Sequence, residues 1–274
     1  LAIKIFKGKY KKKYLHQLIS SQLDMDRIDY LNRDSFYSGV QEGVVGVERI
    51  INMLNVIDNK LVVESKGIYS VEKFLISRRL MYWQVYYHKT VVSAEHMLIK
   101  ILQRAKELSQ NNIELFGTSS LKLLLKNNFN INNFESNSKV LEAFTNLDDF
   151  DIMCAIKEWQ NHEDKILAYL SNKLIKRELF KILILDKPMD EKSILKIKQN
   201  IIKNYNINSF DVHYFFLEGK ITNSAYKLND TDINILFKNN EIKDLIAAAN
   251  KTTISALSKT VQKYFYCLPK NQLI

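Results

Sequence analysis

The sequence contains few of the residues that break helices or cross-link a chain. Its 274 residues include 7 glycines, 2 prolines and 2 cysteines. So few glycines and prolines disfavour a turn-rich β architecture and favour long helices. Cys154 and Cys267 lack the Cys-x-x-Cys spacing of a zinc site, and two cysteines make no disulfide framework. They suit a reducing compartment, so we expect a cytoplasmic protein.

Long apolar runs are missing as well. No uninterrupted run approaches the roughly 18 residues that a membrane helix needs, and no secretory signal opens the chain. We therefore expect no membrane partner. The first residues, "LAIKIF", resemble the middle of a polypeptide more than its beginning. We expect further residues to precede Leu1 in the whole protein.

Positive charge exceeds negative charge. The formal net charge is +10, which favours polyanionic partners such as nucleotides, nucleic acid or acidic lipid headgroups. The densest basic run is "KGKYKKKY", residues 7–14. This run is either a solvated segment or a patch that contacts phosphate, and the sequence leaves both interpretations open.

Hydrophobic residues make up 46% of the chain, enough for a sizeable core, and most of them recur at helical spacing. The pattern predicts helices between Tyr14 and about Ile57 and one long helix from Ser70 to about Ser109. A short hairpin is expected over 59–70, with its turn near Gly67. Further helices are expected near residues 118–127, 136–145, 149–160 and 163–177.

The pattern changes after Arg177. Strands are expected over 179–186, 212–219, 232–238 and 261–269, and helices over 190–205 and 241–249. This β-α-β-β-α-β order is typical of a small sheet backed by two helices. The predicted fold is therefore mainly α, with a helical domain over residues 1–178 followed by a small α+β domain over residues 179–274.

The stretch "SSQLDMDRIDYLNRDS", residues 20–35, is unusually rich in charge. On a helix, one arc of roughly 120° carries two carboxylates, two guanidinium groups and a phenol, namely Asp26, Arg27, Tyr30, Arg33 and Asp34. A carboxylate can bind a divalent metal, and an arginine binds phosphate oxygens through its forked donors. The alternative is a surface helix held by ion pairs such as Asp29 with Arg33.

A second stripe lies in "RRLMYWQVYYHK", where Arg78, Tyr82 and Tyr86 are four residues apart. Such aromatic stripes occur in protein cores more often than in ligand sites. Arg78 at the head of the stripe favours a ligand site, because a buried arginine needs an anion.

The motif "LDMDRIDYLNRDSFYSG" resembles the region of HD-domain phosphohydrolases that follows their central metal-binding helices. Within that superfamily it is similar to the deoxynucleoside triphosphate triphosphohydrolase group. "RRLMYWQVYYHK", "LDDFDIMCAIKEW" and "KRELFKI" resemble later helical segments of the same group. The resemblance covers residues 14–180 well and the rest of the chain more loosely. It implies the C-terminal part of an HD-type helical fold.

The resemblance implies a role for each matched residue. Asp26 would be the last metal ligand, Arg27 and Tyr30 would contact the triphosphate, and Asp34 would contact the sugar. Arg78 would reach the phosphates, while Tyr82 and Tyr86 would line the sugar and base. Tyr82 stands where the mammalian member has a histidine, and Arg27 replaces a lysine. The resemblance also implies a divalent metal cofactor (Mg, Mn, Fe, Co or Zn) and a homo-oligomer.

The adjacent His-Asp pair that gives the superfamily its name is absent, because none of the five histidines precedes an aspartate. We therefore expect the catalytic residues and the remaining metal ligands upstream of Leu1, in an N-terminal segment of the same protein that carries the motif. The predicted function is metal-dependent hydrolysis of nucleotides, with a dNTP giving deoxynucleoside and triphosphate. The alternative is a non-catalytic module for nucleotide binding, nucleic-acid binding or oligomerisation.

Overall fold

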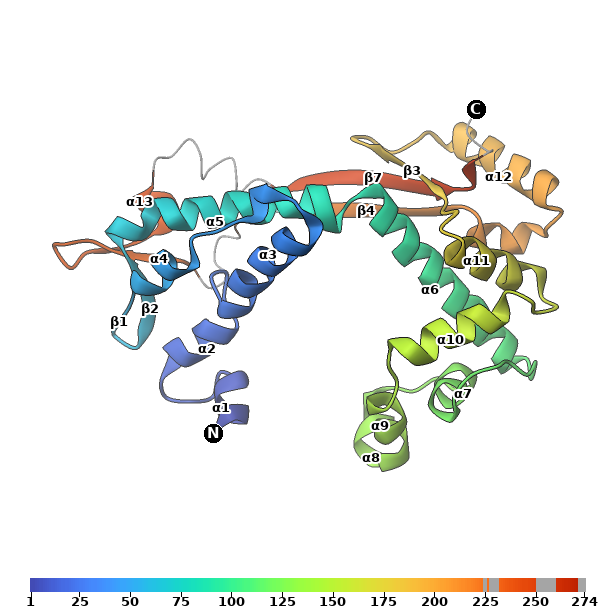
Figure 1. Ribbon diagram of the computed structural model, residues 1–274, viewed down its shortest axis with the longest axis horizontal. Coiled ribbons are helices and arrows are strands. Elements are labelled where there is room, and N and C mark those ends of the chain that lie inside the picture. The colour runs from blue at the N-terminus through green and yellow to red at the C-terminus, as the bar shows by residue number, and fades with distance from the viewer. Residues whose placement is uncertain (224–225, 227–231, 250–259, 271–274) are drawn as a thin grey trace. The chain divides into compact units, whose positions relative to one another are not determined.

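The computed structural model describes residues 1–223, 226, 232–249 and 260–270. The chain forms two compact units, each built from segments distant in sequence (Figure 1). The first unit comprises residues 1–88 and 220–263, and the second comprises residues 89–219 and 264–274. These units differ from the expected segments 1–178 and 179–274, because β strands from the described part of 220–263 pair with the N-terminal part of the chain.

The first unit combines helices with a four-stranded sheet. Its helices and helical turns are α1 (Ala2–Phe6), α2 (Lys13–Ile19), α3 (Met25–Ser38), η1 (Gln41–Gly43), α4 (Val47–Asn52), η2 (Ser65–Gly67), α5 (Ile68–Met81), η3 (Tyr82–Tyr86) and α13 (Leu245–Ala248). Its sheet contains β1 (Leu54–Ile57), β2 (Lys60–Glu64), β5 (Asn234–Leu236) and β6 (Ile242–Asp244), in the order β1-β2-β5-β6.

The sheet begins with a hairpin and is completed by a distant segment. β1 and β2 pair antiparallel around Asp58 and Asn59, which both have positive φ values of 48° and 63°. Two such residues in succession are the signature of a tight hairpin turn. The hairpin is therefore present, but its turn lies at Asp58–Asn59 and not near Gly67, which belongs to η2. β5 then pairs parallel to β2, and β6 pairs antiparallel to β5.

The core of the first unit lies where α3, α4 and α5 meet this sheet. Leu31 of α3, Ile50 of α4, Phe74 and Leu75 of α5 and Ile235 of β5 are all fully buried and belong to one apolar cluster. Helices α3 and α5 lie side by side in Figure 1 and contact each other directly. This packing places the charged face of α3 close to the end of α5.

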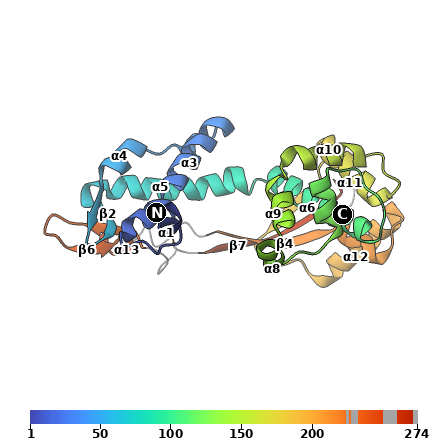
Figure 2. The ribbon, with the colours of Figure 1, turned by 90° about the horizontal axis from the view of Figure 1, so that it is seen from below.

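The second unit is also mainly helical. Its helices are α6 (Lys89–Gln110), α7 (Ser119–Lys126), α8 (Ile131–Ser136), α9 (Ser138–Thr145), α10 (Asp149–Trp159), α11 (Lys165–Ile175), α12 (Glu191–Tyr205) and the turn η4 (Ser209–Tyr214). Helices α10 and α11 pack together (Figure 2). A second sheet has the order β3-β7-β4, from β3 (Lys181–Leu185), β7 (Val261–Leu268) and β4 (Leu217–Asn223).

The fold class is confirmed: the protein is mainly helical, with a helical part followed by a segment that mixes strands and helices. The prediction of one small sheet for that segment is wrong. β3, β4 and β7 form one sheet, whereas β5 and β6 extend the β1–β2 hairpin in another. Much of the expected 241–249 helix is also replaced by β6, which leaves only the short helix α13.

The single long helix expected from Ser70 to about Ser109 is divided. α5 ends at Met81, a π-helical turn covers Tyr82–Tyr86, and α6 begins at Lys89. The Tyr87 N–H donates to the Tyr82 carbonyl oxygen at 2.7 Å, five residues back, which widens the turn. Among the residues that the structure describes, no helix is long and apolar enough to cross a membrane.

Candidate functional site

The first turn of α3 is organised by a buried carboxylate. Asp24 is only 3% exposed and caps the helix, accepting the Arg27 N–H at 2.9 Å and the Ser21 N–H at 3.2 Å. The Arg27 guanidinium also donates to the Asp24 carboxylate and to the Ser21 carbonyl oxygen. Charge-assisted bonds of this kind are among the stronger hydrogen bonds in proteins. The Arg27 side chain is therefore held at the start of the helix.

An aromatic and acidic cluster lies where α3 meets the end of α5 and η3. The Tyr86 hydroxyl donates to Asp34 Oδ2 at 2.7 Å, although these residues are 52 positions apart in sequence. The Tyr30 and Tyr86 rings meet edge to face with centroids 6.1 Å apart, and the Tyr82 and Tyr86 rings do so at 5.1 Å. The Arg78 guanidinium carbon lies 5.7 Å from the centre of the Tyr82 ring.

We call Tyr30, Asp34, Arg78, Tyr82 and Tyr86 the tyrosine cluster. All five were expected to bind substrate, and the structure brings them together from two helical segments. Arg27, the sixth expected residue, lies three residues before Tyr30 on α3. Whether these residues bind a substrate stays a prediction.

Two phenols of the cluster, Tyr30 and Tyr86, have pKa values above the usual one. Burial raises the pKa of Tyr30, and the neighbouring Tyr82 raises it further, while the charges of Arg78 and Arg27 oppose the shift. Burial also raises the pKa of Tyr86, and its hydrogen bond to Asp34 adds to that effect. Protonated phenols can donate hydrogen bonds, so at neutral pH the cluster offers hydroxyl donors beside a guanidinium and a carboxylate.

Tyr82 and Tyr86 are the first and last residues of the π-helical turn. Residues four apart lie on nearly the same side of a helix, and here the segment between them is a π turn, closed by the bond from the Tyr87 N–H to the Tyr82 carbonyl oxygen. Such turns are rare and often occur at functional sites. The same segment also contacts the rest of the first unit: Tyr87 donates to the Thr222 carbonyl oxygen at 3.2 Å, and the Lys263 ammonium lies 5.6 Å from the Trp83 ring centre.

Asp26, the expected metal ligand, lies in the first turn of α3 with an exposed side chain. Farther along the helix, the Arg33 guanidinium binds Asp29 at 2.9 and 3.0 Å, which confirms that ion pair. Over residues 1–223, 226, 232–249 and 260–270, no group of three or more His, Cys, Asp or Glu side chains could hold a metal ion. These residues do not by themselves make a metal site, and Asp26 would need ligands from elsewhere.

Two features of the site were missed from the sequence. Asp24 was not identified as a helix cap, although an aspartate directly before a helix is a recognised start signal. The π-helical turn has no comparable signal in "RRLMYWQVYYHK", where every residue is compatible with an ordinary helix.

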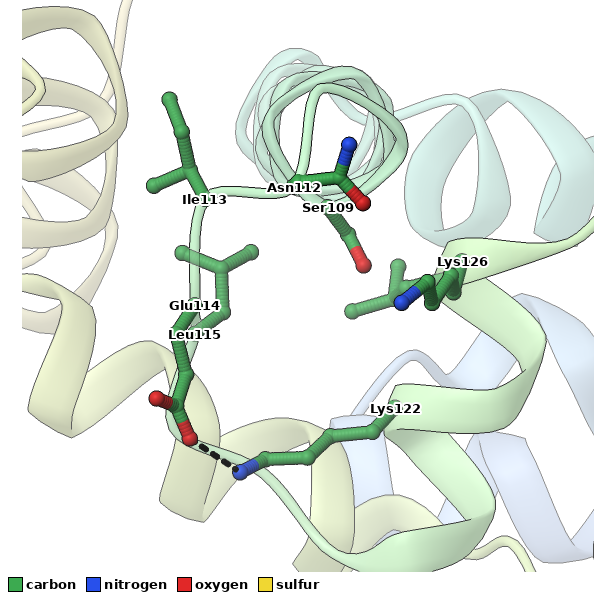
Figure 3. A pocket seen from close by; sticks show the side chains of 8 residues that line it. Ser109, Asn112, Ile113, Glu114, Leu115, Lys122 and Lys126 are labelled. Carbon is green, nitrogen blue, oxygen red and sulfur yellow. Dashed lines mark hydrogen bonds and ion pairs between the residues drawn. The ribbon is translucent and has the colours of Figure 1, made fainter.

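The second unit has a cavity of about 300 Å³ between the end of α6 and α7. Lys122 Nζ and Glu114 Oε1 form an ion pair at 3.5 Å beside this cavity. Figure 3 shows this pair and the Lys126 side chain, which points toward the cavity. None of the residues expected to bind substrate or metal lines this cavity.

Comparisons with known proteins were consistent with the motif resemblance. The model of a family described as HD associated region matches residues 45–127. A crystal structure described as a phosphohydrolase from Bacteroides thetaiotaomicron is 48% identical, with a TM-score of 0.91 over 97% of this chain and 66% of that chain.

Two curated relatives match shorter stretches. An uncharacterised protein of Bacillus subtilis is 39% identical over 171 residues, which cover 62% of this chain and 37% of the relative. A Dictyostelium discoideum protein described as a deoxynucleoside triphosphate triphosphohydrolase SAMHD1 homolog is 28% identical over 109 residues, 38% of this chain and 21% of the relative. The chain thus spans well under half the length of these two relatives.

Proposed function

We infer from these similarities that the chain belongs to the HD-domain phosphohydrolase superfamily, and on that premise we propose that the whole protein hydrolyses nucleotides. The finer proposal is that a deoxynucleoside triphosphate is cut to deoxynucleoside and triphosphate. The description of the Dictyostelium relative supports this choice of substrate. The phosphohydrolase neighbour supports the reaction class alone.

The observation that carries the proposal is the meeting of the tyrosine cluster with Arg27. Arginines bind phosphate oxygens through paired donors; Arg27 lies three residues before Tyr30 on α3, and the Arg78 guanidinium lies over the Tyr82 ring. Asp34 can accept a hydrogen bond from a sugar hydroxyl while its other contact, from Tyr86, holds the carboxylate in place. The rings of Tyr82 and Tyr86 offer apolar surface to the sugar or base. One end of the cluster thus suits phosphate and the other suits a nucleoside.

We propose that hydrolysis requires a divalent metal, with Asp26 as one of its ligands. A divalent ion of this kind supplies polarisation of a phosphate group and activation of water. The other ligands would come from outside the residues that the structure describes. The contribution of this chain is to bind and orient the phosphates, using Arg27 and Arg78, and to hold the nucleoside.

The experiment uses the full-length protein with a panel of deoxynucleotides and ribonucleotides, each with Mg, Mn, Fe, Co or Zn. Products are identified as triphosphate or inorganic phosphate by ion chromatography. Triphosphate release from a dNTP is the expected result. Release of inorganic phosphate alone would contradict the finer proposal and leave the reaction class intact.

Asp26→Ala should reduce metal-dependent hydrolysis to background, because a carboxylate ligand is lost. Asp29→Ala is a matched control, since Asp29 is also an exposed carboxylate of α3 and is bound to Arg33. The control should keep hydrolysis within about twofold of wild type, because surface substitutions rarely disturb a fold. Wild-type turnover by the Asp26 variant would disprove the ligand assignment.

The alternative function is a non-catalytic module that binds a nucleotide or nucleic acid, or that joins subunits of an oligomer. The net charge of +10, which favours polyanionic partners, is the observation behind this candidate. Metal analysis of the full-length protein separates the two functions. A bound divalent ion supports the hydrolase, while nucleotide binding without any metal or turnover supports the module.

A further inference from the structure

The lysine-rich segment before α3 is fixed to the β1–β2 hairpin. Residues 1–13 contain six lysines and no acidic residue. The Lys13 N–H donates to Asn59 Oδ1 at 3.1 Å, and the Asn59 amide donates in turn to the Lys11 carbonyl oxygen at 2.5 Å. The Leu61 N–H donates to Gln17 Oε1 at 2.8 Å. These bonds join residues more than 40 positions apart, so the lysines are presented by an ordered surface.

A cavity of about 370 Å³ opens at this junction. Its lining comes from α2 and the residues before it, from the start of β2 and from the segment that leads into β5, and consists of Gly8, Lys13, His16, Gln17, Lys60, Asp232 and Asn234. A cavity of this volume is within the usual range for small-molecule sites. None of these residues is Arg27 or belongs to the tyrosine cluster, so the cavity and the proposed substrate site share no residue.

One part of the lining is cationic. Lys13 and Lys60 contribute ammonium groups, and His16 contributes an imidazole. Nδ1 of His16 lies 3.0 Å from the Ile5 carbonyl oxygen. Because a carbonyl oxygen only accepts, Nδ1 carries the proton, and the ring orientation is fixed. Gly8, with φ at 65°, lies against this ring: a Cβ there would be 3.4 Å from the imidazole.

The remaining lining residues, Gln17, Asn234 and Asp232, are amides and a carboxylate. They suit the hydroxyl or amino groups of a sugar or base. An adjoining crevice shares these three residues and adds the apolar side chains Leu23, Leu61, Val63 and Ile233. The lining thus combines cationic, polar and apolar groups.

We propose that this cavity binds a small phosphorylated ligand, with its phosphate at Lys13 and Lys60 and its sugar or base at His16, Gln17, Asn234 and Asp232. Ammonium groups bind phosphate as point charges, and two of them here outnumber the single carboxylate of the lining. This proposal does not depend on the protein being a hydrolase.

The test measures binding of inorganic triphosphate and of AMP to the full-length protein by titration calorimetry, with EDTA present and about 150 mM salt. Lys13→Met with Lys60→Met removes both ammonium groups from the lining and should weaken both ligands about tenfold or more, as expected for two charge-assisted contacts. The matched control is Lys4→Met with Lys9→Met, which makes the same charge change outside the cavity. The control should change affinity less than about twofold.

The proposed substrate site is a second place where triphosphate can bind, and Arg78→Ala distinguishes the two. That variant should lose triphosphate binding at the tyrosine cluster and keep triphosphate binding at the cavity of Lys13 and Lys60. The proposal would be overturned if the cavity variant and the control variant weakened ligand binding equally. Binding would then depend on the overall positive charge of the segment and not on the cavity. Loss of all binding in Arg78→Ala, or no binding of either ligand to wild type, would overturn the proposal as well.

Discussion

Asp24 illustrates how one buried side chain can serve both the stability of α3 and the orientation of a candidate binding residue. It caps the helix through the Arg27 N–H and binds the Arg27 guanidinium as well. Asp24→Ala should therefore lower the free energy of unfolding by about 1–3 kcal/mol, the sum of a lost cap and a lost charge-assisted bond. Urea unfolding of the full-length protein measures this change.

A double-mutant cycle separates these two losses. Asp24→Ala and Arg27→Ala, made singly and together, should show a coupling energy of at least about 0.5 kcal/mol, as residues in direct contact usually do. Asp24→Asn keeps an acceptor for the cap and should recover part of the stability. A coupling energy near zero would mean that the Arg27 side chain does not stabilise the carboxylate in solution.

At the same scale, the sequence predicted the tyrosine cluster better than it predicted Asp24. Tyr30 and Asp34 share a helix face because they are four residues apart, and helical spacing is a strong constraint. Tyr82 and Tyr86 have the same spacing on the next segment. Asp24 lies before the helix begins, where the backbone is extended, so its direction cannot be obtained from a helical wheel.

Among the elements, η1 is a close-packed contact between α3 and α5. A Cβ added at Gly43 would lie 2.8 Å from the Ser35 Cβ of α3 and 2.6 Å from the Met81 Sδ of α5. The thioether can move, but the Ser35 Cβ is fixed to its helix. Gly43→Ala should therefore force the two helices apart and cost about 1–3 kcal/mol of unfolding free energy, as overpacking usually does.

Gly46→Ala is the matched control for this prediction, because a Cβ at Gly46 would have nothing within 4 Å. It should change stability by less than about 0.5 kcal/mol. Since α3 and α5 both contribute to the tyrosine cluster, Gly43→Ala should also weaken nucleotide binding, whereas Gly46→Ala should not. Equal stability of the two variants would show that η1 adapts without moving the helices.

The elements that the sequence predicted well share clear local signals. Asp164 before α11 and Asp190 before α12 each accept a backbone N–H from the first turn, and both helices lie where they were expected. The break after Tyr86 was not predicted, because no proline or glycine marks it. The widened turn depends on packing of its aromatic side chains, which local sequence does not specify.

At the scale of the molecule, pairing between distant segments could not be obtained from the sequence. Val63 of β2 pairs with Ile235 of β5, which is 172 residues later in the chain. Each strand is short and apolar, so many partners would satisfy it equally well. The expectation of one C-terminal sheet followed from chain order, but β5 pairs with β2 of the N-terminal hairpin, and its Ile235 joins the apolar cluster of the first unit.

The net charge of +10 is also a property of the whole chain, and it favours binding to polyanions. Nonspecific affinity of the full-length protein for a single-stranded oligonucleotide should fall steeply with salt, because phosphate contacts release counterions. If the six lysines of residues 1–13 supply the contacts, affinity should fall by about two to three orders of magnitude between 50 and 200 mM salt.

A variant with four of these lysines replaced by glutamine tests this surface. The slope of log affinity against log salt should then become shallower by about 3 when the replaced residues are Lys7, Lys9, Lys11 and Lys12. The control replaces four exposed lysines outside this segment, three of them on α12, namely Lys192, Lys196, Lys203 and Lys238. Because charge close to the bound strand matters most, the control should alter the slope much less, and equal slopes would show that the basic segment is not the contact surface.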